Sequence, residues 1–125
     1  AAAEERCYQV MSFIGDIYPA DALKQTNFSR IHVFHSLFCT VAHALFGLED
    51  LEQIDRPQIS AETVGTMRNR LDEVSAQYDA VTEGIAAPQN NDFLEFIEAS
   101  RRATTDLATR KKRTKFLTEQ LLEIQ

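Results

Sequence analysis

The architecture of this chain depends most on Ser29-Arg30-Ile31-His32-Val33-Phe34-His35-Ser36-Leu37-Phe38-Cys39-Thr40-Val41-Ala42-His43. This segment contains all three histidines of the chain and one of its two cysteines. His32, His35, Cys39 and His43 follow one another at spacings of 3, 4 and 4 residues, which places them in one stripe on a helix. Apolar residues surround this stripe, so we expect the helix to lie at the centre of the protein.

Helical patterns continue on both sides of this segment. They predict helices over residues 3–18, 27–47, 60–85, from 92 to a break at 104–106, and 106–124, with a short helical piece within 48–54. The residues expected to cap helix starts are Asn27 or Ser29, Ser60, Asp92, and Asp106 or Thr105. The predicted fold class is all-α, an antiparallel bundle of four to five helices in a single domain over 1–125.

The helix expected over 60–85 carries a regular apolar repeat. Its members alternate at spacings of 3 and 4 residues and are Val64, Met67, Leu71, Val74, Tyr78, Val81 and Ile85. Such a seam is typical of coiled coils and predicts packing along the whole length of a partner helix.

Charge is distributed unevenly along the chain. The formal net charge is -6, yet seven of the 13 basic residues lie within 101–115, where Asp106 is the one acidic residue. The acidic remainder argues against nucleic-acid binding over the whole surface. We take Arg110, Lys111, Arg113 and Lys115 as candidate residues for binding nucleic acid or an acidic partner.

The cysteines and the hydropathy indicate the compartment. Cys7 and Cys39 lie in helical patterns without the spacing of a metal-ligand doublet, and we expect reduced, buried thiols of a cytoplasmic protein. No apolar run approaches the roughly 20 residues of a membrane span, so we expect no membrane partner. The chain begins with Ala rather than Met, and we expect a fragment of a longer protein or a processed start.

The stripe of histidines is a candidate metal site. His35 with Cys39, and Cys39 with His43, have the i, i+4 spacing that can chelate one ion. A zinc site needs three or four protein ligands, and the chain offers neither a further histidine nor a Glu-x-x-His motif. We therefore expect no metal and no cofactor, and interpret His32, Cys39 and His43 as hydrogen-bonded core.

Arg30 and His35 form an Arg-x4-His spacing that resembles the motif of HEPN ribonucleases. In that family an Arg and a His at a dimer interface promote RNA cleavage without a metal, so the resemblance implies catalytic roles for Arg30 and His35. Residues five apart on a helix point about 140° away from each other. The two side chains converge only if Arg30 lies in the first turn and curls over it.

The stretch 91–106, followed by Arg110 and Arg113, resembles the helical region of the GmrSD-type restriction family. There a ParB-like nucleotide-hydrolysing domain precedes a helical region with a Phe-containing helix, a Thr-rich turn and a helix with spaced Arg residues. Residues 27–47 are similar to the preceding helix of that region. The family's Asp-Gly-Gln-Arg motif and its HNH nuclease pattern are absent here, so the resemblance implies the helical module alone.

We therefore hypothesise a non-catalytic helical module of a bacterial restriction or phage-defence protein. Its partner would be its own N-terminal catalytic domain, absent from this sequence, or another protein chain. Two alternatives stay open: a HEPN-like ribonuclease using Arg30 and His35, and a helical dimerisation scaffold. Whether this chain is an enzyme is left open, and a homodimer is a candidate assembly.

Overall fold

The structure, a computed structural model, describes residues 2–101 and 106–125. Its α-helices are α1 (Ala3–Ile17), α2 (Ala20–Leu23), α3 (Ile31–Phe46), α4 (Val64–Thr82), α5 (Asn91–Arg101) and α6 (Leu107–Glu123). Two 3₁₀ turns, η1 (Asn27–Ser29) and η2 (Glu49–Leu51), flank α3. The described residues contain no strand, so the predicted all-α fold is confirmed, with five long helices and the single turn α2.

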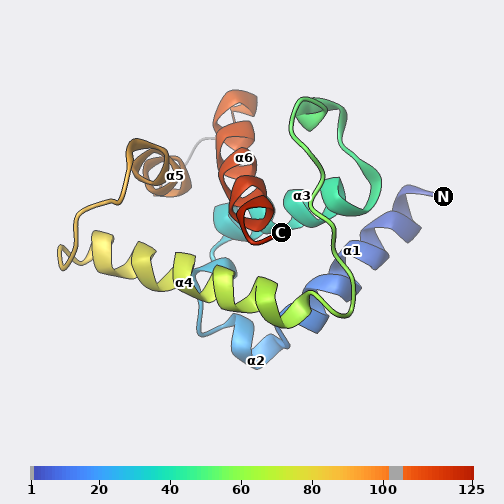
Figure 1. The fold of residues 1–125 in the computed structure, drawn as a ribbon, viewed down its shortest axis with the longest axis horizontal. Helices are drawn as coiled ribbons and strands as arrows, with labels where there is room; N and C mark the ends of the chain where they lie inside the picture. Colours follow the sequence, from blue (N-terminus) through green and yellow to red (C-terminus); the bar gives the residue numbers. More distant parts are fainter. Residues whose placement is uncertain (1, 102–105) are drawn as a thin grey trace.

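The helix α3 lies at the centre of the bundle, as the sequence predicts. It contacts α1, α5, α6 and η1, while Figure 1 shows α4 crossing below and α6 standing above it. Val33, Leu37 and Val41 are at most 1% exposed. A helix that is apolar on most of its faces is stable only when other elements cover those faces.

Small polar residues on α3 allow α6 to approach closely. Thr40 Oγ1 lies 3.3 Å from Thr118 Oγ1 and 3.4 Å from the Thr114 carbonyl oxygen, and all three residues are buried. Thr118 also donates to the Thr114 carbonyl at 2.8 Å. Thr114 donates to the Arg110 carbonyl at 3.1 Å, so each of these three buried hydroxyls has a partner.

The apolar repeat of α4 is buried in its middle and open at its ends. Met67, Leu71, Val74 and Tyr78 are at most 5% exposed, whereas Ile85 is 75% exposed. The helix contacts α1, η1 and α6 in turn, so the prediction of one partner along its whole length is wrong. The reason is that α4 is long enough to cross several shorter elements.

The predicted start of the helix over 27–47 is displaced. α3 begins at Ile31 without a side-chain cap, because the Asn27 amide donates to the Ser75 carbonyl and to Asp79 Oδ1, both at 3.0 Å. Ser29 donates to the Thr26 carbonyl instead. The Asn27 bonds attach η1 to α4, and neither Asn27 nor Ser29 caps α3.

The remaining helix starts differ by a few residues or agree. α4 begins at Val64 rather than at Ser60. α5 is capped by Asn90, whose Oδ1 accepts from the Phe93 N–H at 2.9 Å, and not by Asp92. The Asp106 cap is confirmed, since its carboxylate accepts from the Ala108 N–H at 2.9 Å; the alternative Thr105 lies outside the described residues.

The first half of α1 extends beyond the core. Its buried residues are Val10, Ile14 and Ile17, all in the second half, whereas residues 2–9 are exposed. Cys7 is therefore exposed rather than buried, which corrects the prediction from its helical pattern. Within the described ranges, the helices lack the combination of length and hydropathy that a membrane span requires.

Candidate functional site

The predicted stripe on α3 divides into two regions with different environments. His43 lies near the C-terminal end of the helix and is 1% exposed. Its Nδ1 accepts from the Leu48 N–H at 3.0 Å, and its Nε2 lies 2.9 Å from the Ile54 carbonyl oxygen. These two contacts place the ring proton on Nε2. His43 is thus part of the core, as expected from the sequence.

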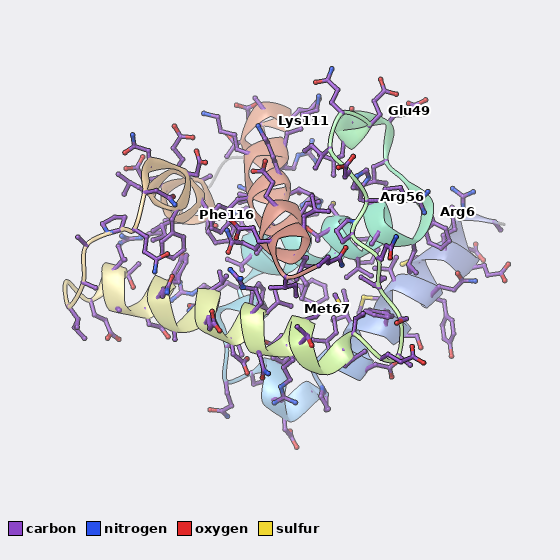
Figure 2. All side chains as sticks on the ribbon, in the orientation of Figure 1. Arg6, Glu49, Arg56, Met67, Lys111 and Phe116 are labelled. Atoms are coloured by element: carbon purple, nitrogen blue, oxygen red, sulfur yellow. The ribbon has the colours of Figure 1, made fainter. Side chains whose placement is uncertain are left out.

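Arg56 completes the C-terminal end of α3. Its guanidinium donates to the carbonyl oxygens of His43 at 3.1 Å, Ala44 at 3.1 Å and Leu45 at 2.8 Å. The His43 carbonyl also accepts from the Gly47 N–H at 2.9 Å. The last carbonyls of a helix lack intrahelical partners, and a cation is favoured at this end of the helix dipole. Figure 2 shows Arg56 on the loop that passes this end. No local sequence pattern predicts this role for Arg56.

His35 and Cys39 form a second, less buried region one turn earlier. Cys39 Sγ lies 3.6 Å from His35 Nε2, and both side chains are partly exposed. The pKa of His35 is lowered below 6.5, mainly by burial and further by the nearby Arg113, Arg110 and His32. Burial raises the pKa of the Cys39 thiol. The pair is therefore neutral at pH 7, a thiol beside an imidazole rather than a thiolate beside an imidazolium.

Two arginines of α6 face this pair. Arg113 is 1% exposed and donates from Nη1 to the Ala99 carbonyl oxygen at 2.8 Å. The Nε atoms of Arg113 and of Arg110 are buried without a hydrogen-bond partner. Over residues 2–101 and 106–125, neither guanidinium forms an ion pair with a carboxylate.

A cavity of about 300 Å³ opens between α3, the start of α6 and η2. Its lining residues are His35, Cys39, Leu48, Asp50, Leu51, Leu107, Arg110 and Thr114. Three leucines form its apolar wall, and its polar groups include one guanidinium, one imidazole and one carboxylate. A concave, largely apolar site with few convergent polar groups is typical of small-ligand binding.

The structure does not bring Arg30 and His35 together within one chain. Arg30 Nε donates to Asn27 Oδ1 at 2.9 Å, and its guanidinium carbon lies 5.6 Å from the centre of the Tyr78 ring. Its contacts are with η1 and α4, whereas His35 faces Cys39 and the arginines of α6. The curl toward His35 on which the motif depends is absent, because Asn27 and Tyr78 hold the guanidinium elsewhere.

The four candidate residues of the basic helix lie in different environments. Lys111 and Lys115 are exposed, and Lys111 Nζ lies 3.7 Å from Asp50 Oδ1 beside η2 (Figure 2). Arg110 is partly exposed and Arg113 is buried. A surface partner of this helix would therefore meet the lysines, while the arginines face the interior.

A metal centre has no basis in the described ranges, where no group of three or more His, Cys, Asp or Glu side chains is placed to hold an ion. In comparisons with known proteins, no family model, curated protein or solved structure matches this chain. Functional proposals for it depend on its own geometry and on the resemblances seen in its sequence.

Proposed function

We propose that this chain is a non-catalytic helical module that packs, through the exposed face of α1, on a catalytic domain of a bacterial restriction or phage-defence protein. The observation that carries the packing role is the exposure of apolar side chains there. Tyr8 is 74% exposed and Met11 is 44% exposed. Large aromatic and Met side chains are enriched in the buried centres of protein interfaces.

The exposed half of α1 is held in place rather than free. The guanidinium carbon of Arg6 lies 5.1 Å from the centre of the Phe46 ring, which joins the start of α1 to the end of α3. A helix that is already positioned loses little conformational freedom when a partner binds. The restriction or phage-defence setting is supported by the resemblance to the GmrSD-type helical region.

The test uses a probe from that family. The isolated ParB-like nucleotide-hydrolysing domain of a GmrSD-type protein is mixed with this chain, and complex formation is measured by size exclusion with light scattering. We expect a complex that the double variant Tyr8→Ala/Met11→Ala weakens by about tenfold or more. Ile85→Ala is the matched control, because Ile85 is 75% exposed at the other end of the molecule. Absence of a complex with the unmodified chain would overturn the proposal.

A HEPN-like metal-independent ribonuclease using Arg30 and His35 is the second candidate. One observation favours it: His35 lines the open cavity, and its lowered pKa keeps it a neutral base at pH 7. Because Arg30 contacts Asn27 and Tyr78, the catalytic pair would join His35 of one copy to Arg30 of a second. This candidate would be established if the chain is a dimer in light scattering and cleaves RNA, and if His35→Ala and Arg30→Ala each abolish the cleavage. A monomeric chain that does not cleave RNA would eliminate it.

The dimerisation scaffold is less favoured by the geometry. Four of the seven residues of the predicted seam are buried against the chain's own helices, so little of the seam is available to a second copy. Light scattering across a concentration series tests this directly. A dimer that Tyr8→Ala/Met11→Ala disperses would assign the α1 surface to self-association.

A further inference from the structure

Two arginines at the cavity beside His35 form no ion pair among the described residues, although the Asp50 carboxylate also lines the cavity. Arg110 lines the cavity, Arg113 lies next to it, and each has a buried Nε without a hydrogen-bond partner. A buried or half-buried guanidinium is costly unless an anion and hydrogen-bond acceptors accompany it. In the described part of the chain neither arginine has an ion-pair partner, although the sequence contains 19 acidic residues.

The remaining walls indicate what kind of anion fits. Leu48, Leu51 and Leu107 line the cavity, and its volume of about 300 Å³ exceeds what a simple inorganic ion needs. Asp50 also lines it, at 3.7 Å from Lys111, so a highly charged anion would meet a carboxylate. These walls suit a single negative charge joined to a short apolar body.

We propose that this cavity binds a small organic carboxylate, with its head group on the Arg110 guanidinium and its apolar body against Leu48, Leu51 and Leu107. Guanidinium and carboxylate groups match in shape and form paired, charge-assisted hydrogen bonds. The inference is independent of the docking of α1, since it concerns a different face and different residues.

His35 provides a reporter inside the cavity. Burial, and after it the positive charge of Arg113 and Arg110, lowers the pKa of its imidazole. A bound carboxylate offsets that charge, so the pKa of His35 rises on binding. NMR resolves the three imidazoles, and His35→Gln assigns the signal.

The experiment is an NMR titration of the whole chain with four probes: hexanoate, hexanol, hexylamine and inorganic phosphate. We expect hexanoate to bind saturably, to shift the signals of His35 and Cys39, and to raise the pKa of His35. Arg110→Gln weakens this binding by about tenfold or more, because a charged hydrogen bond is lost. Lys112→Gln is the matched control: it removes the same charge from the same helix at an exposed position that does not line the cavity.

Leu107→Ala tests the apolar half without endangering the fold, because Leu107 is 51% exposed. It is expected to weaken hexanoate binding several-fold while leaving the backbone spectrum otherwise unchanged. Hexanol or hexylamine binding as tightly as hexanoate, or hexanoate binding that Arg110→Gln leaves unchanged, would overturn the proposal. Phosphate binding as tightly as hexanoate would overturn it as well, since the apolar wall would then contribute nothing.

Discussion

Two histidines on the same helix, eight residues apart, have opposite environments. His43 is buried, with both ring nitrogens bonded to backbone groups of the segment that follows α3. His35 is partly exposed and contacts the Cys39 thiol, and beside it lie two arginines that form no ion pair within residues 2–101 and 106–125. The C-terminal end of α3 is thus a hydrogen-bonded structural joint, whereas the His35 region opens on a cavity beside two arginine Nε atoms without hydrogen-bond partners.

This difference separates the end of α3 that stabilises the fold from the region of α3 that lies beside a binding cavity. Buried polar groups of stable proteins are almost always paired, so a group left unpaired beside a cavity calls for an explanation. At the His43 end both ring nitrogens and three of the last helix carbonyls have partners within the chain. At the His35 end the missing partner is what a ligand would supply. Substitutions at the two ends should therefore affect different measurements.

The largest expected effect is that of His43→Ala. This substitution leaves the Leu48 N–H and the Ile54 carbonyl without their partners and opens a cavity, so we expect a loss of about 2–4 kcal/mol in the free energy of unfolding. Urea unfolding followed by circular dichroism measures it. The matched control is His35→Ala, for which we expect less than about 1 kcal/mol, because His35 is partly exposed. Equal losses for the two variants would contradict the division of α3 into a joint and an open site.

Arg56→Gln is expected to have the next largest effect. It removes three hydrogen bonds to the last carbonyls of α3 and a cation at the negative end of the helix dipole, for a loss of about 1–2 kcal/mol. Arg56→Lys keeps the charge but not the forked geometry, and should recover only part of the loss. Full recovery by lysine would show that charge alone, without these bonds, holds the end of α3.

The helical elements were largely predictable, because periodicity and capping are local properties. The central position of α3 follows from its apolar surroundings, and the Asp106 cap follows from its place before α6. The starts of α3 and α4 were missed because polar side chains near them bond elsewhere: Asn27 bonds to α4, and Thr63 exchanges bonds with Ser60. Competing contacts of this kind cannot be seen in a local pattern.

The candidate site was predictable only in part. The spacing of Arg110 and Arg113 places them on one face of α6, yet nothing in the spacing tells whether that face meets solvent or α3. The partners of His43 come from a segment without regular periodicity, 48–56, whose path depends on the whole fold. The stripe on α3 therefore predicted which residues lie together on the helix, but not which of them has a cavity beside it.

Gly47→Ala sharpens the comparison by testing the backbone at the His43 end. Gly47 ends α3 with φ +76°, a conformation that costs an L residue about 1 kcal/mol or slightly more. We expect that loss in urea unfolding. Gly15→Ala is the opposite-sign control: Gly15 lies within α1 with no atom near the added methyl group, so the substitution should stabilise by about 0.5–1 kcal/mol. A stabilising Gly47→Ala would mean that the end of α3 adjusts freely and is no rigid joint.

The smallest expected effect is a pH dependence that belongs to the His35 end. Burial and the facing Arg113, Arg110 and His32 hold the pKa of His35 below 6.5 in the folded chain, so the unfolded chain takes up this proton first as the pH falls. The free energy of unfolding therefore decreases below about pH 6.5, until His35 also protonates in the folded state.

Subtracting the curve for His35→Gln cancels the other titrating groups, the Asp50 carboxylate of the cavity included. The difference should be flat above pH 7 and fall below 6.5, and saturating hexanoate should reduce that fall because a bound carboxylate raises the pKa of His35. A difference that rises on acidification would mean that His35 has an anionic partner already, and would remove the contrast with His43.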